Sequence, residues 1–408
     1  MMRTLYLLCA VLALLAGCHD RALKLCDITH PDCQQDIYYA DLRLRGDGYD
    51  FFSGVPPIRT IDEPTFRNEL EKEEAEAEQQ RLPTPWWDAA LSLLGLVPST
   101  GDTQGASIDN QVKMTAAYYS LKNRNVTVVS HPELNVDASQ NMNILAHELV
   151  HALQDSEMDL HLQPQSSDEN FAHKALIEGD ASLYQRLFEA EVPGYHTAYP
   201  DPLAYFSRWR DDYLSDDTTL PDSFASLGPP FFAAGWLVYP LGGVWLADRW
   251  DKGGNSAVRH AYGQAPQRSL GYLMGPGVAP PASQDITCEP AVADEFKNKG
   301  HAYGLDSFGA VYFFAYLMGW HVPSSESLSS SLLWRYDLIF VYYNQSTQKT
   351  ALTWRIELAS PLPDSVLALL TTPDGPRVVQ DRSTLLITAS DDPSFLAAGN
   401  PWAACPGS

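Results

Sequence analysis

The residues best suited to chemistry lie in one segment, 137–155, which reads DASQNMNILAHELVHALQD. It contains His147, Glu148 and His151 in the spacing HExxH. Helical residues four apart differ by about 40° around the axis, so both imidazoles can meet one metal ion. Glu148 can then face a metal-bound water without being a ligand. The alternative is a pair of histidines satisfied in a core helix, but with 11 histidines in 408 residues a chance HExxH is expected on the order of 0.01 times per chain.

The sequence around this motif predicts a capped and mostly buried helix. Asp137 and Gln140 stand three residues apart at its start, which is the spacing of a capping box. Apolar residues then recur at helical spacing without glycine or proline, at Ile144, Leu145, Leu149, Val150 and Leu153. The two histidines are therefore expected on a buried helix.

A zinc site with two histidines needs a third protein ligand and leaves one position for water. The candidate is Glu178, 27 residues after His151, in a second predicted helix at 168–191. Gly179 inside that helix costs about 1 kcal/mol relative to alanine, which indicates close packing or a site. Asp180 is predicted to accept a hydrogen bond from the far nitrogen of a ligand histidine. The alternatives are a surface glutamate for Glu178 and a surface carboxylate or salt bridge for Asp180.

These two segments resemble the gluzincin metallopeptidases, in which HExxH is followed by a helix that carries a glutamate ligand. HELVHALQD and ALIEGDA are similar to the HELxHALQD and EGDA motifs of a group of exported or lipid-anchored prokaryotic zinc peptidases. The similarity spans residues 111–389 and includes weaker features: a strand at 126–129 that matches an edge strand, Gly253-Gly254, Ala261-Tyr262 and Trp354-Arg355. The resemblance implies an α+β, zincin-like fold with one Zn²⁺.

The resemblance also implies a mechanism of peptide hydrolysis. His147, His151 and Glu178 would hold zinc, and Glu148 would act as general base on the zinc-bound water. A second donor is needed for the oxyanion, and the candidates are Tyr239, His260 and Tyr262. The strand at 126–129 is expected to pair with an extended peptide, so the expected partner is a peptide or protein substrate.

The chain departs from the pattern of this group in two places. Phe232 stands where the group has tyrosine, and Gly275-Pro276 stands where it has His-Pro. The alternative function is therefore a zinc-stabilised envelope lipoprotein that binds a partner or peptide through the same cleft without turnover. Hydrolysis of a non-peptide amide or ester is a third interpretation.

The first residues predict export. Arg3 is followed by an apolar run at 5–15 that is too short to span a bilayer. Leu15-Ala16-Gly17-Cys18 resembles the lipobox of bacterial lipoproteins, whose cysteine is lipidated. We expect a signal peptide at 1–17, a lipid anchor at Cys18 and a location in the bacterial cell envelope, at the outer membrane or the periplasmic face. The alternative is an ordinary cleaved signal with an incidental cysteine.

Export also predicts disulfides, because four cysteines then remain in an oxidising compartment. The favoured pairing, out of three, joins Cys26 to Cys33 and Cys288 to Cys405. The net charge of −24 repels phosphate backbones, so nucleic acid is not an expected partner. The uncharged stretches 224–247 and 307–322 contain glycines, and the first also prolines, and are predicted to be buried core helices rather than membrane spans.

The predicted organisation has three parts after the signal peptide. Residues 18–110 form an N-terminal tether with a Glu-rich helix at 66–81, a short helix at 86–97 and a loop at 98–109. Residues 111–280 form the metal-binding core. Residues 281–408 form a C-terminal extension with strands at 338–343, 351–358 and 384–389 and a helix at 364–370.

Overall fold

The computed structural model describes residues 23–46, 54–78, 84–98, 103–130, 137–157, 160, 164–193, 200–214, 229–281, 302–344, 346–372, 375–391, 395 and 402. The chain is a mixed α+β protein, as predicted. It divides into two compact units whose segments alternate along the sequence. The first unit comprises Met1–Phe66, Met114–His161 and Asp180–Pro202, and the second comprises Arg67–Lys113, Leu162–Gly179 and Leu203–Ser408. The predicted division into 18–110, 111–280 and 281–408 stays a prediction. The predicted signal peptide, Cys18, Cys288 and Cys405 lie outside the described residues.

The first unit contains a three-stranded sheet with the order β1-β3-β2. Its strands are β1 (Ile58–Asp62), β2 (Ala117–Ser120) and β3 (Asn125–Ser130). β1 is parallel to β3 and β2 is antiparallel to it, so β3 has a partner on both sides. The expectation that residues 126–129 form the edge is therefore wrong. The segment 58–62, from the predicted tether, covers that side of β3 and leaves β2 at an edge among the described residues.

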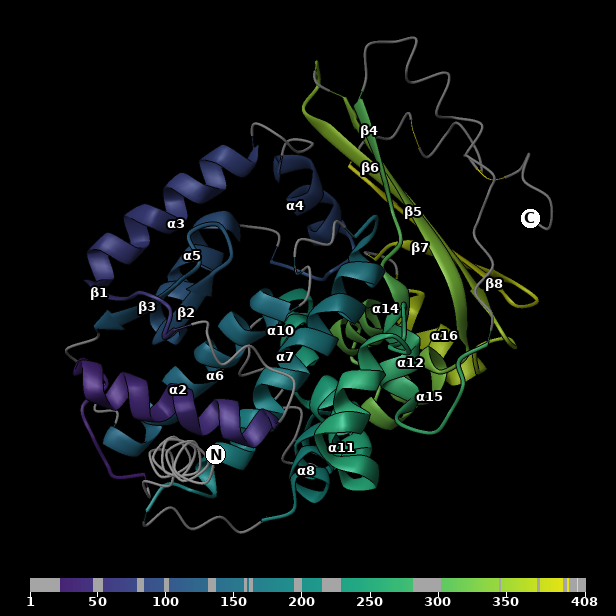
Figure 1. Cartoon of the computed structure of the whole chain (residues 1–408). Helices are drawn as coiled ribbons and strands as arrows, with labels where there is room; N and C mark the ends of the chain where they lie inside the picture. Colours follow the sequence, from purple (N-terminus) through teal and green to yellow (C-terminus); the bar gives the residue numbers. More distant parts are fainter. Residues whose placement is uncertain are drawn as a thin grey trace, which may run out of the picture. The chain divides into compact units, whose positions relative to one another are not determined.

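Helices α2 (Pro31–Arg45), α6 (Ala138–Glu157) and the end of α7 (Ser167–Glu189) complete this unit (Figure 1). The capping box forms as predicted: Asp137 N–H donates to Gln140 Oε1 (3.2 Å), and Gln140 N–H donates to Asp137 Oδ1 (2.9 Å). The predicted disulfide between Cys26 and Cys33 is present. The buried core joins α2, α6, β3 and α7 through Ile37, Leu42, Val126, Leu145, Leu149, Leu153 and Phe188.

The second unit contains a five-stranded antiparallel sheet with the order β4-β5-β6-β8-β7. Its strands are β4 (Ala302–Asp306), β5 (Trp334–Asn344), β6 (Lys349–Leu358), β7 (Arg377–Asp381) and β8 (Thr384–Ser390). The three predicted strands are confirmed as β5, β6 and β8. Two of the five, β4 and β7, are not predicted from the sequence, and both are edge strands of only five residues.

Successive residues of each strand point to opposite faces of this sheet, and different parts of the chain pack on the two faces. On one face, α14 (Gly309–Gly319) and α4 (Thr84–Leu93) pack against β5 (Figure 1). Trp354 lies there in edge-to-face contact with Phe308, Phe313 and Tyr316. On the other face, Phe340 and Tyr342 pack with Phe395 and Trp402.

The second unit contains further helices, and those at 63–78, 238–262 and 364–370 overlap helices predicted from the sequence. These further helices are α3 (Glu63–Glu78), α5 (Thr103–Met114), α8 (Pro202–Leu214), α10 (Pro230–Trp236), α11 (Val238–Tyr262), α12 (Ser269–Met274), α15 (Ser324–Ser331) and α16 (Asp364–Leu370). The prediction of a loop at 98–109 is wrong, because α5 begins at Thr103. Ile108 and Val112 are buried one turn apart, and their packing outweighs the low helix propensity of the residues around them.

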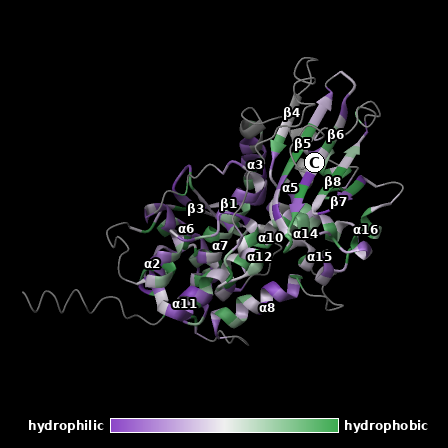
Figure 2. Cartoon of the chain, turned by 90° about the vertical axis from the view of Figure 1, so that its right-hand side faces the viewer, coloured by the Kyte–Doolittle hydropathy of each residue, from purple (hydrophilic) through white to green (hydrophobic). Residues whose placement is uncertain are grey.

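Apolar helices form the interior of this unit. Green colour, which marks apolar residues, gathers around α10, α12 and α14 in Figure 2. Among the described residues, Pro230–Tyr262 is the one helical stretch long and apolar enough to cross a membrane, and 67% of its most apolar window is buried. Gly254, at φ +57°, interrupts this stretch within α11. Burial and interruption are typical of a core helix.

Three aspartates, of which Asp168 and Asp337 are buried and Asp306 is half-buried, bind the N-termini of three helices in the second unit. Asp306 accepts a hydrogen bond from the first backbone N–H of α7 (2.8 Å), and Asp168 accepts one from the first N–H of α12 (2.8 Å). Asp337 accepts from the N–H groups of Phe308 and Gly309 at the start of α14 (3.0 and 3.1 Å). Carboxylates at helix N-termini satisfy orphan donors and complement the helix dipole.

These aspartates predict a dependence of stability on pH. Burial, and to a smaller extent the charge of Asp337, raises the pKa of Asp168 and of Asp306 from 3.8 to about 6, although hydrogen bonds from serine partly oppose the rise. A carboxyl group with a higher pKa in the folded state binds more protons when folded, so its contribution to stability is full below pH 4 and is lost as pH rises to about 6. Asp306→Asn should therefore gain stability relative to wild type between pH 4 and 7, by up to about 3 kcal/mol, as measured by urea unfolding.

The exposed Asp381 at the end of β7 provides the control for this measurement. Asp381→Asn should follow the pH dependence of wild type. A constant difference between Asp306→Asn and wild type across this pH range would contradict the assignment of a raised pKa to Asp306.

Candidate metal centre

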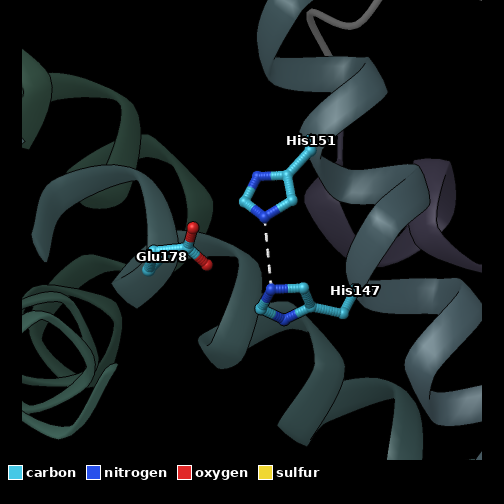
Figure 3. A group of neighbouring side chains, drawn as sticks. All are labelled: His147, His151 and Glu178. Carbon is cyan, nitrogen blue, oxygen red and sulfur yellow. Dashed lines mark hydrogen bonds between the residues drawn. The ribbon is translucent and has the colours of Figure 1, made fainter. Parts of the chain in front are cut away.

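The three predicted ligands come together from two helices. His147 and His151 stand one turn apart on α6, and Glu178 stands on α7. One nitrogen from each histidine and one carboxylate oxygen of Glu178 lie within 4.8 Å of one another. Figure 3 shows the carboxylate directed towards the two rings, whose Nε2 atoms are 3.2 Å apart. The three side chains that the sequence singled out therefore form one group.

The hydrogen bonds of His151 determine which of its nitrogens faces this group. Its Nδ1 lies 2.8 Å from Gln154 Oε1, and Gln154 Nε2 donates to Asp180 Oδ2 at 2.8 Å. Because a carboxylate only accepts, the amide nitrogen of Gln154 must face Asp180 and its oxygen must face His151. Nδ1 of His151 therefore carries the proton, and Nε2 presents a lone pair.

His147 has a matching arrangement. Its Nδ1 lies 3.2 Å from Gln185 Oε1 on α7. With the Gln185 oxygen on that side, Nδ1–H donates to it and Nε2 is left as an acceptor. Two imidazole lone pairs and one carboxylate oxygen thus converge. Such atoms repel one another and attract a cation, and this donor set suits Zn²⁺ and related transition ions. The group of His147, His151 and Glu178 can hold a metal ion.

Asp180 reaches the histidine through Gln154, which corrects the predicted direct bond. Its Oδ2 also accepts from Nη1 of Arg45 at 2.9 Å, and both side chains of this ion pair are buried. The sequence contained a signal for Gln154, since it stands three residues after His151 and so faces the same side of α6. It contained none for Arg45, which belongs to the predicted tether.

Arg45 is enclosed by groups that accommodate its charge. Its guanidinium lies 4.4 Å from the ring centroid of Tyr184. Asp41, one turn earlier on α2, is also buried. Burial raises the pKa of Asp41 well above its usual range, and the charge of Arg45 opposes that rise only in part. By geometry, the ion pair of Arg45 is with Asp180.

No protein-family model, curated protein or solved structure matches this chain.

Glu148 is held beside the ligands by the edge strand. Its Oε2 accepts a hydrogen bond from the backbone N–H of Tyr119 in β2 at 2.7 Å, and its side chain is buried. The Tyr119 hydroxyl donates to Asp155 Oδ2 at 2.8 Å, two turns further along α6. Burial, together with Asp155, raises the pKa of Tyr119 above its ordinary value. These two bonds fasten β2 along the HExxH helix.

The candidate oxyanion donors all lie on α11. His260 is exposed and contacts Gln264 (3.0 Å). Tyr239 packs among aromatic rings, 5.6 Å from Trp236 and 6.4 Å from Trp209 between centroids. Tyr262 is half-buried. Which of these three residues donates the second hydrogen bond to the oxyanion stays a prediction.

Gly179 marks close packing, as its place inside a helix predicts. A Cβ on Gly179 would lie 2.3 Å from a backbone atom of Gly242 in α11, and a Cβ on Gly242 would lie 1.7 Å from the backbone oxygen of Ala175. Neither neighbour is a flexible side chain that can move aside. The contact between α7 and α11 therefore requires glycine at both positions, and it fixes the backbone beside Glu178.

This contact predicts that Gly179→Ala destabilises the fold and displaces Glu178. Forcing an extra methyl group into a packed contact costs about 1 to 3 kcal/mol, so the urea midpoint should fall and metal affinity with it. Gly235→Ala is the matched control, because Gly235 lies in α10 and a methyl group added there would have no atom within 4 Å. The control should be neutral or slightly stabilising. Equal stability of the two variants would contradict the packing argument.

Proposed function

We propose that this protein is a zinc-dependent peptidase with a zincin-like core, in which His147, His151 and Glu178 hold one Zn²⁺. The observation that carries the proposal is the convergence, within 4.8 Å, of two imidazole nitrogens from α6 and a carboxylate oxygen from α7, with Glu148 next to His147 on α6. Bound zinc would polarise a scissile carbonyl and lower the pKa of water towards neutrality.

The chain's own residues supply the remaining steps. Gln154 and Gln185 orient the two imidazoles through Nδ1–H. Glu148 takes a proton from the attacking water and passes it to the leaving amine. Its orientation is fixed by the backbone N–H of Tyr119, which binds one carboxylate oxygen.

The direction of this bond supports an extended peptide as the substrate. Because Tyr119 N–H itself binds Glu148, a peptide would pair with the other outward backbone groups of β2. In an antiparallel pair, alternate residues direct their backbone groups away from the partner strand. Tyr119 N–H points away from β3, since it binds Glu148, and Ala117 shares this direction two residues earlier. A peptide that adds to the edge of β2 would then run beside Glu148.

We also infer that the protein is exported and anchored in the cell envelope through a lipid on Cys18. The disulfide between Cys26 and Cys33 supports an oxidising compartment. Cys18→Ser should move the protein from the detergent phase to the soluble fraction or leave its leader uncut, as judged by phase separation and mass. Membrane retention after leader removal would instead indicate that an apolar stretch such as Pro230–Tyr262 is a true span.

The proposed function predicts that two glutamate variants fail differently. Glu178→Gln should weaken metal affinity, because a neutral amide is a poorer ligand than a carboxylate. Glu148→Gln should keep one zinc per chain by elemental analysis, while peptide or casein cleavage falls roughly 10²- to 10⁴-fold.

Other outcomes of this experiment have distinct meanings. Wild-type metal content in both His147→Ala and His151→Ala would end the metal hypothesis. Loss of zinc in Glu148→Gln with retention in Glu178→Gln would reverse the assigned roles. Equal activity of wild type and Glu148→Gln, with zinc in both, would favour the envelope lipoprotein that binds without turnover.

A further inference from the structure

We propose that Arg45 is a positioning residue of the metal centre, which acts through Asp180 and Gln154 to set the tautomer of His151. The proposal rests on the proposed function in one respect, namely that His151 is a metal ligand. It extends the site to α2, in the N-terminal segment that the sequence assigned to a tether.

The contacts form one continuous series. Arg45 Nη1 donates to Asp180 Oδ2 (2.9 Å), Gln154 Nε2 donates to the same oxygen (2.8 Å), and Gln154 Oε1 faces His151 Nδ1 (2.8 Å). Arg45, Asp180 and Gln154 are all buried. Water therefore has little access to replace any of these bonds, and removal of one member leaves a polar group without its partner.

The series matters because a glutamine amide can present either end to a histidine. With its oxygen towards Nδ1, Gln154 selects the ring with the proton on Nδ1, and the lone pair of Nε2 remains available to a metal. With its nitrogen towards Nδ1, it would select the proton on Nε2, and that nitrogen could not bind a cation. Asp180 permits only the first orientation, and Arg45 holds the Asp180 oxygen that imposes it.

The helix that carries Arg45, α2, is held in place at both of its ends. At the far end, Cys26, disulfide-bonded to Cys33, places its Sγ 3.9 Å from Met142 Sδ on α6. At the near end, Arg45 lies over the ring of Tyr184. The helix that delivers Arg45 is therefore fixed against the helix that carries His151.

The first test is the tautomer of His151 in the metal-free protein, observed by ¹⁵N NMR of the imidazole nitrogens. Wild type should show the form protonated on Nδ1. Arg45→Met and Gln154→Met should show a mixture of tautomers, and Arg45→Lys, which keeps a cation, should restore part of the wild-type signal. A wild-type spectrum in a folded Arg45→Met would overturn the proposal. Where that variant does not fold, wild-type spectra in both single variants, Asp180→Asn and Gln154→Met, would overturn it.

The second test is a double-mutant cycle on Zn²⁺ affinity, measured by competition with a chelating dye. Gln154→Met should weaken binding by about 10- to 100-fold, and Arg45→Met by a similar factor. In the Gln154→Met background, Arg45→Met should add less than about twofold, because its effect passes through the missing amide. If the double variant instead loses the product of the two single losses in zinc affinity, Arg45 acts on the fold in general and the proposal is overturned.

Arg186 supplies the matched control for these variants. It is another buried arginine, on α7, paired with Glu189. Arg186→Met should lower stability but leave the His151 tautomer and zinc affinity near wild type. If wild type binds no zinc, the proposed function fails while the NMR test still decides whether Arg45 sets the tautomer. If zinc binds but neither measurement responds to Arg45→Met, the proposed function stands and the positioning role fails.

Discussion

A carboxylate can only accept hydrogen bonds, and at Asp180 this property sets the orientation of the Gln154 amide and, through it, the position of the proton on His151. One oxygen of Asp180 receives both Arg45 and Gln154. The amide of Gln154 is thereby oriented, and with it the proton of His151. A buried ion pair is costly to assemble, since its desolvation offsets much of its attraction. Here it is joined to a histidine of the candidate metal group, which gives a reason for its presence in the core.

The centre also depends on how closely helices can approach. Because Gly179 and Gly242 have no side chains, the backbones of α7 and α11 touch at the residue next to Glu178. Further along α7, Asp180 and Gln185 contact side chains of α6. One continuous helix therefore carries a proposed ligand, an orienting carboxylate and an orienting amide. Its rigidity relates these groups to one another more closely than separate loops would.

Several carboxylates in this protein, whose net charge is −24, bind backbone N–H groups. Asp306, Asp168 and Asp337 each accept backbone N–H groups at the start of a helix. Glu148 accepts a backbone N–H of the edge strand. In each case the acceptor comes from a segment remote in sequence, so that a single bond both satisfies a backbone donor and joins distant parts of the chain.

The sequence by itself determined the local features: the HExxH helix and its capping box, the strands of β5, β6 and β8, and the close packing marked by Gly179. These follow from helical and strand periodicity and from residues within a few positions of one another. Only the tertiary structure decided that 58–62 covers β3, that Gln154 stands between Asp180 and His151, and that Arg45 belongs to the site. Such pairings join segments up to 135 positions apart, and periodicity within one segment carries no information about which distant segment packs against it.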